Sequence, residues 1–219
     1  TEYFYRPGKA TFQAAIQRRE NLEVLLAPES SLEYMRILEN SRQGTGEGSI
    51  NGMLIDSEDG RYASIVMDVP SSEDLWMAHS FIFANYALIV SRPTLADLAA
   101  VRHTLSLLLS GLKSEKRLAR ESIYLVLNQF TDRSGFTPRS FQEELSKTLG
   151  WTPPLAAIVP YDPGVPQAQD DGTPPVTRGD EFAKGIRAIV NTLFPSVGSS
   201  INSSNEHKSV LRLPKIRFT

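Results

Sequence analysis

The sequence predicts an α/β fold, a mostly parallel sheet with helices on both faces, and two observations carry this prediction. Short apolar runs rich in β-branched residues are apolar throughout, which is typical of strands buried on both faces. Helical patterns separate these runs from about residue 64 onward, and such alternation gives a parallel sheet with right-handed crossovers. We expect one α/β domain over residues 1–195 and a C-terminal tail over 196–219.

The strands are expected where the apolar runs lie, at residues 22–26, 64–67, 87–90, 123–127 and 156–159. Between the last run and the last helix, residues 161–180 are rich in proline and glycine. This composition favours an irregular surface loop.

Three helices are expected from apolar positions that recur at three- and four-residue spacing, over residues 94–112, 137–150 and 180–194. Thr94 followed by Asp97 has the spacing of a capping box at the start of the first helix. The second helix has Thr137 as its expected N-cap and Gly150 as its stop. Asp180 is the expected cap of the third.

Composition excludes several classes of site. The 219 residues contain no cysteine, which removes disulfides, zinc thiolates and iron–sulfur clusters. A net charge of −2 gives no electrostatic reason to expect nucleic acid as a partner. No apolar run approaches the ~20 residues that span a bilayer, and none has the pattern of a signal peptide, so we expect a cytoplasmic protein.

Ligands of open parallel sheets bind beyond the carboxyl ends of the strands, so the residues after each run are the candidate site. Asp68 follows the run at 64–67, and Pro70 then stops the strand. A carboxylate there can orient water bound to Mg²⁺, as in phosphoryl-transfer sites, which makes Asp68 the candidate catalytic and metal-binding residue. The alternative is an aspartate that caps the next helix.

Three further strand ends carry candidate residues. Asn128 follows the run at 123–127, and its amide offers both a donor and an acceptor, which suits the edge of a purine base. An Asx turn is the alternative for Asn128. Pro160 and Asp162 end the last run, where an ordinary strand exit is the alternative, and Ser91 with Arg92 end the third run.

A phosphate loop is not visible in the sequence. A Walker A motif needs G-x-x-x-x-G-K-[S/T] after a strand, so that backbone amides and a lysine hold the phosphates. Gly8 and Lys9 are followed by Ala10, with no strand or earlier glycine before them. The glycine-rich residues 44–49 contain no lysine. We therefore expect the phosphate-binding part to be absent from this chain.

Taken in order, these stretches resemble the MinD/ParA family of deviant Walker A ATPases, and most closely its CpaE/TadZ group of pilus-assembly and localisation proteins. The stretch YASIVMDVPSS (62–72) resembles the family's Walker B strand and second switch. IYLVLNQF (123–130) is similar to the strand with the adenine-side asparagine, and LAAIVPYD (155–162) to its I-P-x-D segment. The likeness extends over roughly residues 11–195 and implies a SIMIBI-type P-loop NTPase fold whose N-terminal part is missing.

The resemblance implies ATP or ADP with Mg²⁺ as ligands. Asp68 would be the Walker B-type acid near magnesium, Asn128 would contact adenine, and Pro160 and Asp162 would line the base pocket. The implied activity is that of a nucleotide-dependent dimeric switch that positions or assembles a pilus or secretion system, a septum or a cargo. ATP hydrolysis would need a phosphate loop, so this chain alone is expected to be inactive.

Two other functions stay open. A non-catalytic scaffold of the same fold would dock a partner protein without nucleotide, and a flavodoxin-like nucleotide-binding protein follows from fold analogy alone. The expected partners are a second copy of the chain or a protein of a pilus, secretion or positioning system. Residues 208–219 mix basic and apolar side chains and could lie peripherally at the inner face of a membrane. Because Pro214 prevents a regular amphipathic helix, an edge strand or an unattached tail is the alternative.

Overall fold

The structure is a computed structural model of the 219-residue chain and describes residues 17–19, 22–24, 62, 64–69, 80–81, 84–111, 118–177 and 180–195. The chain divides into two compact units. The first comprises residues 1–80 with 213–219, and the second comprises residues 81–212. The expected domain over residues 1–195 stays a prediction. No helix of the described residues is both long enough and apolar enough to cross a membrane.

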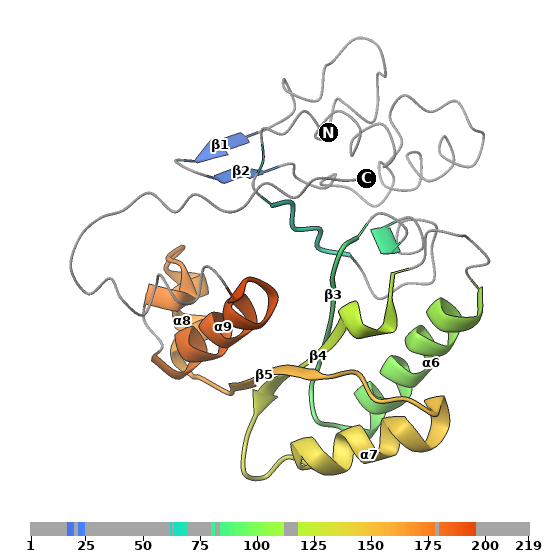
Figure 1. The fold of residues 1–219 in the computed structure, drawn as a ribbon. Helices are drawn as coiled ribbons and strands as arrows, with labels where there is room; N and C mark the ends of the chain where they lie inside the picture. The colour runs from blue at the N-terminus through green and yellow to red at the C-terminus, as the bar shows by residue number, and fades with distance from the viewer. Residues whose placement is uncertain are drawn as a thin grey trace, which may run out of the picture. The chain divides into compact units, whose positions relative to one another are not determined.

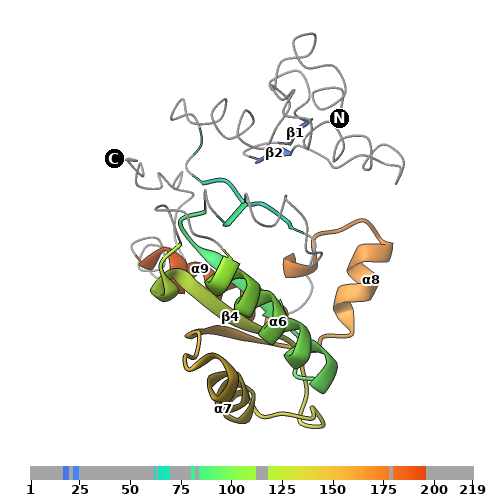
Figure 2. The same ribbon diagram turned by 90° about the vertical axis from the view of Figure 1, so that its right-hand side faces the viewer.

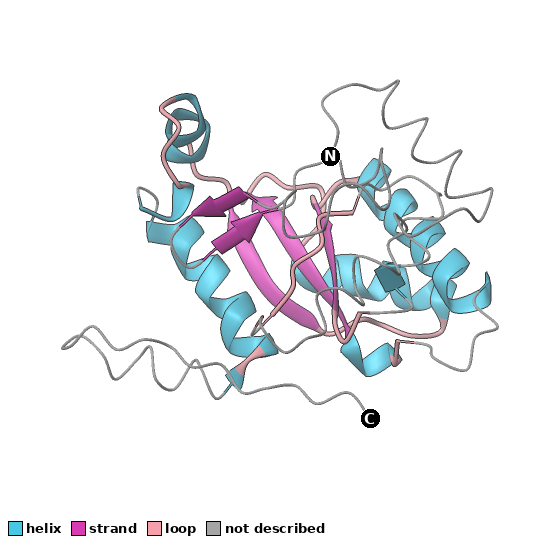
Figure 3. Cartoon of the chain, turned by 90° about the horizontal axis from the view of Figure 1, so that it is seen from above, coloured by secondary structure: helices cyan, strands magenta, loops and turns pink. Residues whose placement is uncertain are grey.

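The second unit contains a parallel sheet with helices on both faces (Figure 1). Its elements in chain order are β3 (Ala87–Ser91), α6 (Leu95–Gly111), η1 (Arg120–Ser122), β4 (Ile123–Phe130), α7 (Pro138–Leu149), β5 (Leu155–Pro160), α8 (Gly164–Asp170), η2 (Pro175–Thr177) and α9 (Asp180–Leu193). The strands pair in the order β3-β4-β5, and both pairs are parallel. This confirms the predicted α/β class, and Figure 3 shows helices flanking the strands on either side.

The larger core lies between the sheet and the helices α6 and α7, which Figure 2 shows close to β4. Phe141 and Leu145 of α7 are fully buried there. From α6 and the strands, the same cluster receives Leu98, Val101, Leu105, Ile123, Leu125 and Leu127. Each fully buried side chain of this size contributes about 1.5–3 kcal/mol of transfer free energy, so this face holds the two helices on the sheet.

The opposite face of the sheet is covered by α9. Val126 of β4 and Val159 of β5 are buried there, with Phe182 and Ile189 of α9 packed against them. Gly185 of α9 faces Val159 at a distance that leaves no room for a side chain. The two core clusters on opposite faces explain why β4 and β5 read as continuous apolar runs in the sequence.

The predicted ends of α7 are confirmed. The Thr137 hydroxyl accepts a hydrogen bond from the Ser140 backbone N–H, and the Ser140 hydroxyl accepts one from the Thr137 N–H, which completes a capping box. Pro138 is the first helical residue, and Gly150 ends the helix with a left-handed φ of 61°. Thr94 is likewise confirmed as the residue just before α6, and its hydroxyl accepts from the Asp97 N–H.

Two strand predictions in the first unit are wrong. Residues 22–26 were expected to form a buried parallel strand, whereas β2 (Leu22–Val24) pairs antiparallel with β1 (Gln17–Arg19) and exposes 62% of Leu22. The reason is local, since a hairpin partner only two residues away satisfies the backbone without a crossover. The expected strand at 64–67 is not formed, because these residues have no paired strand in the described part of the chain, and Val66 is 91% exposed.

The loop expected over 161–180 is more regular than predicted, because it contains α8 and η2. The difference arises because Pro163 and Pro166 are typical signs of irregular structure in a sequence. Both residues sit at the start of α8, where a missing backbone N–H removes no helical hydrogen bond.

Candidate functional site

The carboxyl ends of β3, β4 and β5 lie at one edge of the sheet because neighbouring strands are parallel. Ser91 is paired with Leu127, and the next residue of β4, Asn128, is paired with Val159 of β5. Three of the four predicted site residues, Asn128, Pro160 and Asp162, therefore come together at this edge. It is the edge at which ligands of α/β sheets bind.

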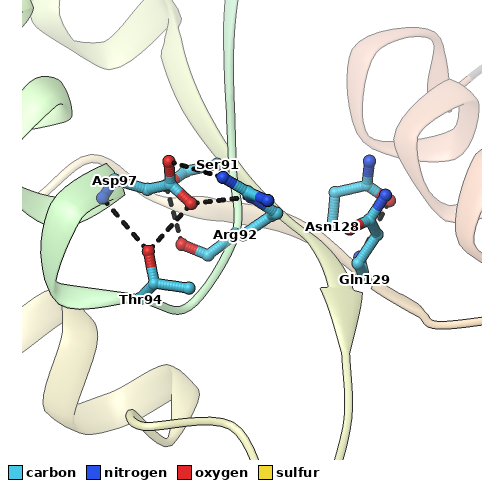
Figure 4. A network of polar contacts seen from close by, with 6 residues as sticks. All are labelled: Ser91, Arg92, Thr94, Asp97, Asn128 and Gln129. Carbon is cyan, nitrogen blue, oxygen red and sulfur yellow. Dashed lines mark hydrogen bonds and ion pairs between the residues drawn. The ribbon is translucent and has the colours of Figure 1, made fainter.

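Asn128 lies inside β4 rather than beyond it, because the strand continues to Phe130. Its side chain is half-buried, and its Oδ1 accepts a hydrogen bond of 2.9 Å from the Gln129 backbone N–H (Figure 4). Gln129 has a positive φ of 55° and interrupts the pairing of β4 with β5. The Asn128 amide is thus held by its own strand and not by a turn after it.

The end of β3 carries an ion-pair network, shown on the left of Figure 4. Arg92 Nε lies 2.9 Å from Asp97 Oδ2 in the first turn of α6, and the Thr94 hydroxyl donates to the same oxygen. The hydrogen bond from Arg92 holds the pKa of Asp97 below its ordinary value, although desolvation of the carboxylate opposes the shift. Beside this network, the buried Ser91 hydroxyl donates to the Arg92 carbonyl oxygen.

The end of β5 leads directly into α8. Asp162 Oδ1 accepts a hydrogen bond of 2.8 Å from the Gly164 N–H, which fixes the carboxylate at the start of that helix. Tyr161, between Pro160 and Asp162, donates its backbone N–H to the Phe130 carbonyl oxygen at 2.9 Å and leaves 53% of its surface exposed. The hydrogen bond from the Gly164 N–H therefore occupies Oδ1 of Asp162, which holds the start of α8 in place.

Asp68 belongs to the first unit, so the site at the sheet edge is built from the second unit alone. Asp68 is exposed and lies in a segment without regular structure, not at the end of a buried strand as predicted. In the described part of the chain, no group of three or more His, Cys, Asp or Glu side chains could hold a metal ion. The role of Asp68 in binding magnesium stays a prediction that rests on the sequence.

Sequence reasoning missed two features of this edge. Gln129 is not a residue type that favours positive φ, so nothing in the sequence indicated the irregularity beside Asn128. The pair between Arg92 and Asp97 has a signal in the sequence, because both residues flank the expected helix start and Asp97 has the spacing of a capping box with Thr94.

Comparison with solved structures identifies the architecture. The cell division ATPase MinD of Pyrococcus furiosus superposes with a TM-score of 0.61 at 20% identity, over 85% of this chain and 71% of that one. The septum site-determining protein MinD of Pyrococcus horikoshii OT3 gives 0.64 at 19% identity, over 88% and 72%. The chain has the MinD-type fold. The MinC:MinD cell division protein complex of Aquifex aeolicus gives 0.58 at 17% identity, over 97% and 75%.

The MinD-type fold agrees with the resemblance to the MinD/ParA family that the sequence stretches show. No family model matches the sequence, and no curated protein matches it. Of the similar structures, the P. horikoshii MinD is complexed with Mg-ADP, and the A. aeolicus MinD is in complex with MinC.

Proposed function

We propose that this chain is part of a MinD/ParA-type ATPase that acts as a nucleotide-dependent switch. The observation that carries the proposal is the gathering of Asn128, Pro160 and Asp162 at the carboxyl edge of adjacent parallel strands in a MinD-type fold. A protein of that fold is complexed with Mg-ADP, so ATP or ADP with Mg²⁺ is the proposed ligand.

Each residue has a proposed role that follows from its chemistry. The Asn128 amide presents a donor and an acceptor to the base edge. Pro160 offers an apolar wall, and Asp162 holds the start of α8 beside it. Asp68 would orient a water of the magnesium shell, a role that a carboxylate can take in phosphoryl-transfer sites.

Calorimetric titration of the full-length protein with ATP and GTP, with and without Mg²⁺, tests this assignment. Asp68→Ala should weaken only the magnesium-dependent part of binding, and Asn128→Ala should relax the preference for adenine. Two controls remove the same groups from exposed positions elsewhere: Glu121→Ala just before β4, and Asn191→Ala on α9. A wild-type protein that binds neither nucleotide would end the proposal.

The switch itself would be a change of assembly. We propose that nucleotide favours a homodimer or a complex with a protein of a pilus, secretion, septum or cargo-positioning system, with a CpaE-like pilus role as the finer form. The A. aeolicus MinD complexed with MinC is an example of a protein partner for this fold. Light scattering with and without Mg-ATP measures the change, and an unaltered mass with ATP bound would contradict a nucleotide-driven switch.

A nucleotide-independent scaffold is the second candidate, and one observation favours it. The 219 residues contain no G-x-x-x-x-G-K-[S/T] sequence, so they lack the usual loop that holds phosphates. A scaffold of this kind would form the same dimer or hetero-complex in the absence of ATP. The light-scattering measurement separates the two functions directly.

We also propose a cytoplasmic location with peripheral contact at the inner face of a membrane. The supporting sequence is the basic and apolar stretch 208–219, which lies outside the described residues. Anionic lipids attract such segments. Co-sedimentation with vesicles containing phosphatidylserine, with and without residues 208–219, tests this. Equal sedimentation of both proteins would rule out the segment as the membrane contact.

A further inference from the structure

Gln129 has an uncommon backbone conformation next to the proposed base-reading residue. Its φ of 55° is the sole positive φ of a non-glycine residue within the part of the chain that the structure describes. A residue with a Cβ adopts this region unfavourably, and glutamine is not among the types enriched there. Such conformations persist where the surrounding structure imposes them, and they cluster at binding sites.

The conformation comes from one extra residue in β4. Asn128 pairs with Val159, and Phe130 pairs with Pro160, the very next residue of β5, so Gln129 has no partner. The ladder resumes at once, because the Tyr161 N–H donates to the Phe130 carbonyl oxygen at 2.9 Å. The Gln129 N–H is directed instead to Asn128 Oδ1, also at 2.9 Å.

This hydrogen bond determines where the oxygen and the nitrogen of the Asn128 amide lie. A backbone N–H can only donate, so the atom that faces it must be the oxygen and not the nitrogen. Within the described residues, both hydrogens of Nδ2 and one lone pair of Oδ1 remain for a ligand. The free surface of Asn128 is therefore a donor beside an acceptor.

That pattern fits one purine better than the other. Adenine presents a ring-nitrogen acceptor beside an amino donor, whereas guanine presents two acceptors, N7 and O6, on the corresponding edge. We propose that Gln129 is a positioning residue, whose left-handed backbone aims the Asn128 amide so that it selects adenine over guanine. This inference rests on the proposed nucleotide-binding function.

Substitutions at position 129 separate backbone conformation from side-chain chemistry. Glycine adopts positive φ freely, and asparagine tolerates it, so Gln129→Gly and Gln129→Asn should keep the Asn128 amide in place. Valine is β-branched and strongly disfavours this region, so Gln129→Val should release the amide. Gln129 is exposed, and these changes leave both core clusters intact.

The experiment is the ratio of ATP to GTP dissociation constants for the full-length protein and its variants. Gln129→Val and Asn128→Ala should each lower the adenine preference at least about fivefold, the lower range for losing a bidentate amide contact. Gln129→Gly and Gln129→Asn should stay within about twofold of wild type. If Gln129→Val does not fold, Gln129→Ala takes its place with the same expected direction.

The outcomes distinguish this inference from the proposed function. If the wild type prefers ATP and Asn128→Ala loses the preference while Gln129→Val keeps it, the positioning role is overturned and nucleotide binding stands. If the glycine variant loses the preference as fully as the valine variant, the side chain and not the backbone is responsible, and the inference is again overturned. Wild-type protein that binds neither nucleotide overturns both.

Discussion

Gly185 of α9 lies so close to Val159 of β5 that a methyl group on the glycine would come within 2.9 Å of Val159 Cγ2. The same methyl group would be 3.2 Å from the Val159 Cα, which belongs to the backbone and cannot rotate away. Helix and strand therefore approach each other as closely as a residue without a side chain permits. Because Val159 is paired with Asn128, this contact supports the strand end at which the candidate site lies.

Gly185→Ala should destabilise the protein although alanine is the better helix former. The gain in helix propensity is about 1 kcal/mol, and overpacking of a close contact costs about 1–3 kcal/mol, so we expect a net loss of about 1 kcal/mol. The urea midpoint of unfolding measures it. Asn191→Ala, exposed on the same helix, is the control and should change stability by less than about 0.5 kcal/mol. A Gly185→Ala protein as stable as wild type would show that α9 can shift away from Val159 without loss of stability.

The sequence predicted the second unit well, because burial on two faces leaves a plain signal. The runs at 87–90, 123–127 and 156–159 became β3, β4 and β5. Two-sided burial explains the runs of β4 and β5, whereas Val90 of β3 is apolar although it is exposed. The caps Thr94 and Thr137 were equally readable, because a hydroxyl that accepts a backbone N–H is a local device. The convergence of Asn128 with Pro160 and Asp162 followed from parallel pairing alone.

Other features depend on contacts with other segments of the chain, which the local sequence cannot indicate. The run at 64–67 has the composition of a strand, but a strand also needs a neighbour, and these residues have none in the described part of the chain. The extra residue at Gln129 is set by the offset between β4 and β5, which neither strand encodes by itself. Asp68 follows the run at 64–67, so its predicted place at a strand end was wrong for the same reason.

Thr94→Val should weaken the start of α6. The Thr94 hydroxyl accepts a hydrogen bond of 3.1 Å from the Asp97 N–H, and valine has the same shape without that oxygen. Loss of an N-cap costs about 1 kcal/mol. Thermal unfolding measures the change, with Thr94→Ser as the matched control that keeps the hydroxyl. If serine and valine destabilise equally, the methyl group and not the cap is what matters.

The pH dependence of stability should include a contribution from Asp97. The Arg92 hydrogen bond holds the pKa of Asp97 below its ordinary value, which is about 3.9 in the unfolded chain. The resulting stabilisation is fully present above that pH and is lost as the pH falls through the lower folded pKa. Arg92→Gln should raise the Asp97 pKa toward about 3.9 and remove this contribution, as NMR titration of the carboxyl carbon would report.

The matched control for this titration is the exposed pair on α7. Arg139 Nε lies 2.8 Å from Glu143 Oε1, and Arg139→Gln removes an arginine without touching Asp97. The Asp97 pKa should be the same in that variant as in wild type. A wild-type Asp97 that titrates at its ordinary value would contradict the ion pair.

Gly150→Ala should destabilise the end of α7 through backbone conformation alone. Gly150 has a φ of 61°, and a Cβ there would meet nothing within 4 Å, so no clash contributes to the loss. An alanine in the left-handed region costs about 1 kcal/mol or more.

Gly135→Ala is the matched control, because Gly135 has no positive φ and its Cβ would only approach the Pro93 carbonyl oxygen to 3.8 Å. Urea unfolding should place Gly150→Ala below wild type and Gly135→Ala at or slightly above it, since alanine restricts the unfolded chain. Equal stability of the two variants would mean that α7 ends in a different conformation in solution.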